Sequence, residues 1–208
     1  MVKEVWPYLT GGLALTAILA LAGVPGLAAA AAAATFLVAA FFRDPRRAVT
    51  VDPRLILSPA DGRVVGVTQP NEPTGTSRIS IFLSVFNVHV NRAPAAGRVS
   101  DVRYTPGAFL PAFRDKASDL NEQNLIWLET DRGPLGVKQI AGLIARRIRC
   151  WKRPGDDVAQ GEKIGFITFG SRVDLFLPAE ATPTVRVGET VRAGMSVVAV
   201  YPERGGGV

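Results

Sequence analysis

The N-terminal part of the chain is almost uniformly hydrophobic. No charged residue occurs between Glu4 and Arg43, and the intervening positions are mostly Ala, Leu, Val, Phe and Gly. An α-helix that crosses a bilayer needs about 20 apolar residues, so this run is nearly two such lengths. Val24-Pro25-Gly26 interrupts the run with residues typical of turns. The pattern therefore predicts one helix from about residue 8 to 22 and another from about 27 to 42.

These helices would form a membrane anchor over residues 1–47. In a hairpin, Lys3 lies on the same side of the membrane as the arginines that follow the run, which are Arg43, Arg46 and Arg47. Because positive residues favour the cytoplasmic side, the rest of the chain is predicted to lie there, at the cell membrane. The arginines also attract anionic headgroups. Two alternatives stay open: one long helix kinked at Pro25, and a cleaved signal peptide whose alanine run supplies the cleavage site.

After Asp52 the pattern changes to short alternations of apolar and polar residues, which is the period of a half-buried β-strand. Many short strands separated by turn signals are typical of a β-sandwich or a partly open barrel. We therefore expect a mainly β domain over residues 48–208, in which only residues 109–124 suggest a helix or a loop. The alternating runs are 62–68, 78–90, 97–104, 125–129, 135–148, 163–169, 172–177, 184–187 and 196–200.

One ten-residue pattern occurs twice in this domain. G-D-D-V-A-Q-G-E-K-I at 155–164 and G-E-T-V-R-A-G-M-S-V at 188–197 share G-[D/E]-x-V-x-x-G-x-x-[I/V]. The copies predict related strand-turn-strand halves of a small barrel. They resemble the hammerhead repeats of biotinyl and lipoyl carrier domains, which carry their cofactor on a lysine between the repeats. No lysine occurs between these two copies, so a carrier function is disfavoured.

The composition narrows the classes of function. The chain has 208 residues and a formal net charge of +6, which points to an anionic partner such as nucleic acid, a membrane surface or an acidic substrate. The hydrophobic run disfavours nucleic acid. Cys150 is the single cysteine and His89 the single histidine. An intramolecular disulfide is therefore impossible, and no metal site of the usual zinc type is expected.

The stretch G-F-I-T-F-G-S-R-V-D-L-F-L-P at 165–178 contains the pair Gly170-Ser171 inside a strand pattern. Glycine adds no packing to a strand and weakens it. Either the pair is a turn or a bulge, or the backbone itself reacts at this position.

Two other motifs contain residues capable of acid–base chemistry. Asp61 precedes Gly62 in a dipeptide that is common in turns. His89 lies in an apolar run, where strict alternation would place it on one face with Asn87 and Asn91. Each residue therefore has a structural interpretation beside the catalytic one.

Six motifs occur in order between Arg43 and Pro178. They are R-D-P-R-R after the hydrophobic run, S-P-A-D-G-R-V, N-V-H-V-N-R-A-P, D-K-A-S-x-x-N-E-Q-N, V-K-Q-I-A-G-L-I-A-R-R-I and F-G-S-R-V-D-L-F-L-P. Together they resemble the short prokaryotic form of phosphatidylserine decarboxylase. The resemblance implies that the protein cuts its own Gly170–Ser171 bond, giving chains of residues 1–170 and 171–208. It also implies that Ser171 becomes an N-terminal pyruvoyl group, which serves as the cofactor.

The resemblance also assigns roles to the acid–base residues. Ser171 Oγ would attack the carbonyl carbon of Gly170, with His89 as the base and Asp61 as the carboxylate that orients it. Longer family members carry two histidines three residues apart, whereas this chain has only His89. Either His89 serves both self-cleavage and decarboxylation, or another group assists.

The implied reaction converts phosphatidylserine to phosphatidylethanolamine and CO₂, through a Schiff base between the pyruvoyl group and the substrate amine. The stretch 113–124 is rich in charged and amide residues, and it is either a solvated loop or a binding segment for the headgroup phosphate or carboxylate. The implied partners are a phospholipid, an anionic membrane, and the two cleavage products in one heterodimer, with further oligomerisation left open. The candidate substrate-binding residues are Lys116, Ser118, Asn121 and Asn124.

Two other functions stay open at this point. The protein is then either an uncleaved, membrane-anchored protein that binds anionic lipid, or a decarboxylase of an ether-lipid analogue of phosphoserine. A serine hydrolase that uses Ser171 is disfavoured, because no G-x-S-x-G pattern surrounds this residue. The intact mass separates the enzyme from the binding protein, since only the enzyme consists of two chains.

Overall fold

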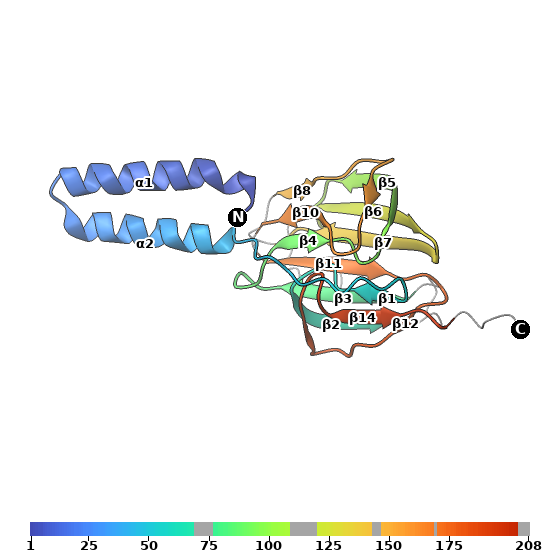
Figure 1. The fold of residues 1–208 in the computed structure, drawn as a ribbon. Helices are drawn as coiled ribbons and strands as arrows, with labels where there is room; N and C mark the ends of the chain where they lie inside the picture. Colours follow the sequence, from blue (N-terminus) through green and yellow to red (C-terminus); the bar gives the residue numbers. More distant parts are fainter. Residues whose placement is uncertain (69–76, 109–119, 143–146, 169, 204–208) are drawn as a thin grey trace, which may run out of the picture. The chain divides into compact units, whose positions relative to one another are not determined.

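Helices occupy the N-terminal part of the chain and strands occupy the remainder (Figure 1). The computed structural model describes residues 1–68, 77–108, 120–142, 147–168 and 170–203. The chain divides into two units, Met1–Arg46 and Arg47–Val208. The helices are η1 (Lys3–Val5), α1 (Trp6–Leu21) and α2 (Pro25–Phe41). The strands are β1 (Leu55–Leu57), β2 (Gly62–Thr68), β3 (Arg78–Leu83), β4 (Val90–Arg92), β5 (Gly97–Thr105), β6 (Gln123–Thr130), β7 (Gly133–Ile140), β8 (Ile148–Cys150), β9 (Asp157–Val158), β10 (Lys163–Ile167), β11 (Ser171–Phe176), β12 (Thr182–Pro183), β13 (Thr190–Val191) and β14 (Val197–Val200).

In the first unit, α1 and α2 lie side by side and are joined by a short turn (Figure 1). The turn is made by Gly23, whose φ of +74° is readily adopted only by glycine. Pro25 does not lie in the turn, as the sequence pattern predicted, but begins α2. Proline is favoured at the first helical position, because its missing N–H would have no partner there.

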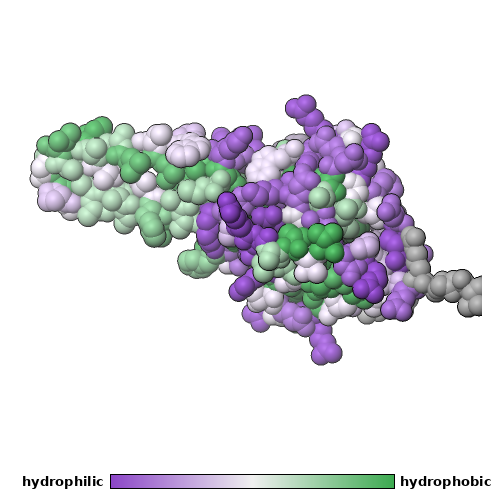
Figure 2. Space-filling model, in the orientation of Figure 1, coloured by the Kyte–Doolittle hydropathy of each residue, from purple (hydrophilic) through white to green (hydrophobic). Residues whose placement is uncertain are grey.

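The helices present mainly hydrophobic side chains (Figure 2). The segment Lys3–Leu21 is long and apolar enough to cross a membrane by length and composition, and α2 is a shorter apolar helix. Hydroxyl groups in these helices donate to carbonyl oxygens one turn earlier, at 2.8 to 3.2 Å, in Thr10, Thr16 and Thr35. These hydroxyls therefore have partners that do not depend on water, which suits an apolar environment.

The second unit is mainly β, as predicted. Its largest sheet has eight strands in the order β13-β2-β3-β11-β7-β6-β5-β9, all paired antiparallel, and it curls into a half-barrel. Two three-stranded sheets, β1-β14-β12 and β4-β10-β8, complete the unit. Side chains from all three sheets share one hydrophobic core, which includes Ile56, Val64, Ile81, Leu128, Ile164, Val173 and Val198.

Two of the predicted strands are shorter than the alternation suggested. The run predicted over 78–90 ends at Leu83, because a turn follows it directly. The run predicted over 135–148 is divided between β7 and β8. Within the stretch 109–124, residues 109–119 lie outside the described part of the chain, and β6 begins at Gln123.

The two copies of the glycine pattern have the same backbone geometry. Both of their glycines have positive φ, a region that other residues avoid. In each copy, the first glycine donates its N–H to a strand valine carbonyl 2.8 Å away. The φ values are +95° at Gly155, +78° at Gly161, +98° at Gly188 and +69° at Gly194.

The strands that receive these hydrogen bonds are also related in sequence, which the sequence analysis missed. Pro-Ala-Asp-Gly-Arg-Val at 59–64 corresponds to Pro-Ala-Ala-Gly-Arg-Val at 94–99. The two segments exchange backbone hydrogen bonds reciprocally, each proline carbonyl accepting an N–H from beside the other segment at 2.9 Å. The unit therefore consists of two related halves that pair with each other.

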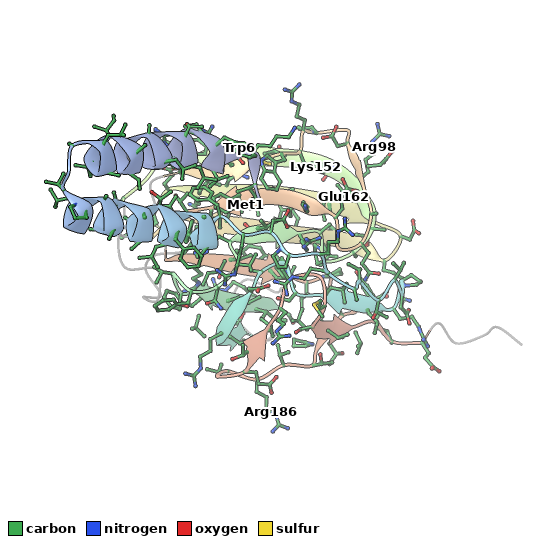
Figure 3. The ribbon with its side chains drawn as sticks, turned by 60° about the vertical axis from the view of Figure 1, so that its left-hand side comes forward. Met1, Trp6, Arg98, Lys152, Glu162 and Arg186 are labelled. Carbon is green, nitrogen blue, oxygen red and sulfur yellow. The ribbon has the colours of Figure 1, made fainter. Side chains whose placement is uncertain are left out.

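An ion pair between Lys152 and Glu162 supports the first copy of the pattern (Figure 3). Burial alone would raise the pKa of the Glu162 carboxyl. The Lys152 ammonium and the N–H of Ala159, which donates at 2.9 Å, outweigh this effect and hold that pKa below its usual value.

Candidate active site

The residues of the sequence motifs meet at one end of the eight-stranded sheet (Figure 1). β11 begins at Ser171, which pairs with Leu83 at the end of β3. On the far side of β3, β2 begins at Gly62. On the other side of β11, β7 ends at Ile140. The segments that enter and leave these strands therefore surround the start of β11.

Gly170 and Ser171 lie at the entrance to β11. Gly170 has a φ of +61°, and a Cβ atom built on it would have no heavy atom within 4 Å. Its glycine is therefore explained by backbone conformation and not by crowding. Ser171 is fully buried, and its Oγ has no hydrogen-bond partner among the residues that the structure describes. A buried hydroxyl without a partner is destabilising, so its presence indicates a role other than packing.

His89 is fully buried and is held by backbone groups of two segments. Its Nδ1 lies 3.0 Å from the carbonyl oxygen of Asn87, and its own carbonyl accepts the N–H of Ile167 at 3.3 Å. A carbonyl oxygen only accepts hydrogen bonds, so in the neutral ring Nδ1 carries the proton and Nε2 carries the lone pair of a base. The ring packs edge-on against Phe166, with 6.4 Å between the ring centroids. Both segments that hold His89 continue toward the start of β11.

Asp61 is held by two strong hydrogen bonds. Its Oδ2 accepts from Nη2 of Arg47 at 2.7 Å, and its Oδ1 accepts from the backbone N–H of Ala193 at 2.7 Å. The side chains of Arg47 and Asp61 are only 9% and 11% exposed. The corresponding turn in the other half of the unit has Ala96 in place of Asp61, so the turn itself does not require a carboxylate.

Arg47 is a site residue that the sequence analysis did not identify. Its position in a basic cluster suggested contact with lipid headgroups, but its guanidinium group pairs with Asp61. No sequence signal connects two residues so far apart in a loop region. The acceptor that faces Nδ1 of His89 is the Asn87 carbonyl oxygen. Orientation of His89 by Asp61 stays a prediction.

Two predicted substrate-binding residues donate their amide N–H groups to the protein. Asn121 Nδ2 donates to the carbonyl of Ala141 at 2.7 Å, and Asn124 Nδ2 donates to Oε1 of Gln139 at 3.0 Å. Gln139 Nε2 donates in turn to Oδ1 of Asn91 at 2.9 Å. This buried chain of amides connects β6, β7 and β4.

The remaining two predicted substrate-binding residues, Lys116 and Ser118, lie outside the described residues. Substrate binding by all four positions therefore stays a prediction. In the part of the chain that the structure describes, no three His, Cys, Asp or Glu side chains are grouped so that they could hold a metal ion.

A buried ion pair lies on β11 directly after Ser171. Arg172 Nε donates to Oδ1 of Asp174, and Arg172 Nη2 donates to Oγ of Ser80 on β3, both at 2.7 Å. Both charged side chains are almost completely buried. Their spacing in the sequence places them on one face of a strand, but it did not show that this face is buried. The pair ties β11 to β3 next to the start of β11.

Comparisons with known proteins agree with this geometry. A family model described as phosphatidylserine decarboxylase matches residues 34–199. The chain is 48% identical over 201 residues to a phosphatidylserine decarboxylase proenzyme of Ralstonia pickettii (strain 12J), covering 95% of this chain and 94% of the relative. It is 47% identical over 201 residues, with the same coverage, to the proenzyme of the same name from Ralstonia nicotianae (strain ATCC BAA-1114 / GMI1000).

Proposed function

The chain belongs to the phosphatidylserine decarboxylase family, and we propose that it is a proenzyme that cleaves itself between Gly170 and Ser171. The observation that carries the proposal is the buried Ser171 hydroxyl, without a partner among the described residues, directly after a glycine at φ +61°. The mature enzyme would convert phosphatidylserine to phosphatidylethanolamine and CO₂.

Self-cleavage begins when Ser171 Oγ attacks the carbonyl carbon of Gly170. Glycine favours this attack, because it has no side chain to shield the carbonyl and it adopts the left-handed turn without strain. Nε2 of His89 accepts the hydroxyl proton, and the contact between Nδ1 and the Asn87 carbonyl keeps the ring in the required tautomer. The Gly170–Ser171 amide bond breaks, and an ester joins Gly170 to the side chain of Ser171.

The ester is then cleaved by elimination. The Cα proton of residue 171 is removed, and the Gly170 carboxylate leaves from Cβ, which produces dehydroalanine. Tautomerisation to the imine and addition of water release ammonia. The products are residues 1–170, with a free carboxylate, and residues 171–208, with an N-terminal pyruvoyl group.

The residues at this position fit a pyruvoyl group. The site of Ser171 is fully buried, and the space beside Gly170 is open, so a small carbonyl group would be shielded from water yet reachable from one side. The group supplies an electron sink for loss of the substrate carboxyl group. Asp61 and Arg47 hold the segment that enters β2 at the same end of the sheet.

The two products would stay together, because their strands alternate. β11 lies between β3 and β7, β13 pairs with β2, and β14 pairs with β1. All of these partner strands belong to residues 1–170. Separation of the chains would expose the shared hydrophobic core, so this arrangement supports a heterodimer of the cleavage products.

The membrane arrangement is also part of the proposal. The hydrophobic helices would hold the enzyme at the cell membrane, and Lys3, Arg43 and Arg46 favour a cytoplasmic location of the catalytic unit. Lys116, Ser118, Asn121 and Asn124 are proposed to contact the substrate headgroup. Lys116→Ala should then raise the KM for lipid while self-cleavage continues; an uncleaved variant would place Lys116 in processing instead.

Intact mass spectrometry of the purified full-length protein tests self-cleavage. The wild type should give two chains, 1–170 and 171–208, and the smaller chain should lack a free amino terminus. Ser171→Ala should remain one chain of 22.1 kDa, and His89→Ala should be cleaved slowly or not at all. Ser100→Ala, on the exposed face of β5, is the matched control and should be cleaved normally. Active wild-type protein with an intact Ser171 would overturn the proposal.

A further inference from the structure

The turn between β3 and β4 presents two large hydrophobic side chains to solvent. Val85 is 38% exposed and Phe86 is 83% exposed. The turn is closed by three hydrogen bonds: Asn87 Oδ1 accepts from the N–H and the hydroxyl of Ser84 at 2.9 and 2.7 Å, and the Asn87 N–H donates to the Ser84 carbonyl at 3.0 Å. The hydrophobic tip is therefore held in an ordered turn.

This turn connects the two residues on which self-cleavage depends. It begins directly after Leu83, which pairs with Ser171, and it ends at Asn87, whose carbonyl oxygen faces Nδ1 of His89. Whatever molecule lies against Phe86 is therefore close to the entrance of the active site. The proposed substrate, a phospholipid, enters from a membrane surface.

Other side chains at the same end of the sheet suit a membrane surface. Tyr104, near the end of β5, and Leu120, just before β6, are exposed hydrophobic residues. Arg147 is exposed, and its carbonyl accepts both the N–H and the hydroxyl of Thr168, three residues before Ser171. Aromatic and aliphatic tips with nearby cations are the combination that binds at the interface of an anionic bilayer.

We propose that the Ser84–Asn87 turn inserts Phe86 and Val85 into the headgroup region of the bilayer, so that this end of the sheet faces the lipid that the enzyme uses. The proposal rests on the proposed function for the identity of the substrate. Its physical basis is the transfer of the Phe86 ring from water to an apolar environment. Burial of such a ring corresponds to about a tenfold or larger effect on binding.

The first test measures insertion and needs no catalysis. The protein is the full-length Ser171→Ala variant with Cys150→Ser, and with Phe86→Cys labelled by an environment-sensitive fluorophore. It is reconstituted in vesicles of phosphatidylcholine and phosphatidylserine that contain brominated lipid. The matched control is Val187→Cys, which is 62% exposed and follows Arg186, a side chain that projects away from the fold (Figure 3). Brominated lipid should quench the label at position 86 several-fold more than the label at 187.

The second test measures activity. Phe86→Ala should lower turnover of phosphatidylserine in vesicles about tenfold relative to turnover of a soluble, short-chain phosphatidylserine, and Phe86→Leu should restore most of the ratio. Equal quenching at positions 86 and 187, or an unchanged ratio of activities, would overturn the proposal. Quenching at position 86 in a protein without decarboxylase activity would support the membrane contact and refute the proposed function, so the two failures are distinguishable.

Discussion

Replacement of Gly170 by alanine tests whether the left-handed turn drives self-cleavage. Gly170 has a φ of +61°, and an added Cβ would meet nothing within 4 Å. The substitution therefore introduces no clash and changes only the backbone preference. A residue with a Cβ in this region is destabilised by about 1 to 2 kcal/mol.

The size of the effect follows from this preference. Because the surrounding space is open, the alanine variant can relax to negative φ, and the turn that permits attack becomes a minor conformer. A difference of about 1 to 2 kcal/mol corresponds to a decrease of about 5- to 30-fold in the population of that turn, and the rate of self-cleavage should fall by the same factor. The strain also limits the loss of stability to about 2 kcal/mol, or about 8 °C in melting temperature.

The assay follows newly translated full-length protein as it converts to residues 1–170 and 171–208. Gly170→Asn should be cleaved faster than Gly170→Ala, since asparagine adopts left-handed φ more readily. Gly23→Ala is the matched control: its φ is +74°, its Cβ would also meet nothing within 4 Å, and it lies in the other unit, so its cleavage rate should stay at the wild-type value. A Gly170→Ala variant that is cleaved at the wild-type rate, or an asparagine variant as slow as the alanine variant, would refute the reasoning.

Three further predictions follow from the ion pairs. Arg47→Ala and Asp61→Asn should each slow self-cleavage about tenfold, and the double variant should be no slower than the worse single variant; additive effects would show that the residues do not act as a pair. Asp174→Ala leaves Arg172 as a buried unpaired charge and should lower the free energy of unfolding by about 3 to 5 kcal/mol in urea titrations of the Ser171→Ala protein. An Arg172→Leu substitution added to Asp174→Ala should recover most of this loss, and a loss below about 1 kcal/mol for the single variant would contradict the pairing. Because the pKa of Glu162 is lowered in the folded state, its contribution to stability is present above its unfolded pKa of about 4.3 and is lost as the pH falls through the folded value, so Glu162→Gln should lower the melting temperature at pH 7 more than at pH 3.

The sequence by itself determined the features that depend on local preference. A run without charges predicted apolar helices, and alternation predicted a mainly β domain. The repeated glycine pattern was recognisable because only glycine readily adopts the positive φ that both copies share. The order of the motifs identified the family. It also directed attention to Gly170-Ser171, because a glycine inside a strand pattern needs a special explanation.

Only the tertiary structure decided which side chains meet. The pairing of Arg47 with Asp61 depends on a loop returning to the start of β2, and the burial of Arg172 and Asp174 depends on what covers their face of the sheet. Alternation also overestimated the strand before His89, where three hydrogen bonds between Ser84 and Asn87 form a turn instead. Contacts of this kind join residues that are distant in the chain or compete with a regular strand. Their free energies depend on register and burial, which no local pattern of residues encodes.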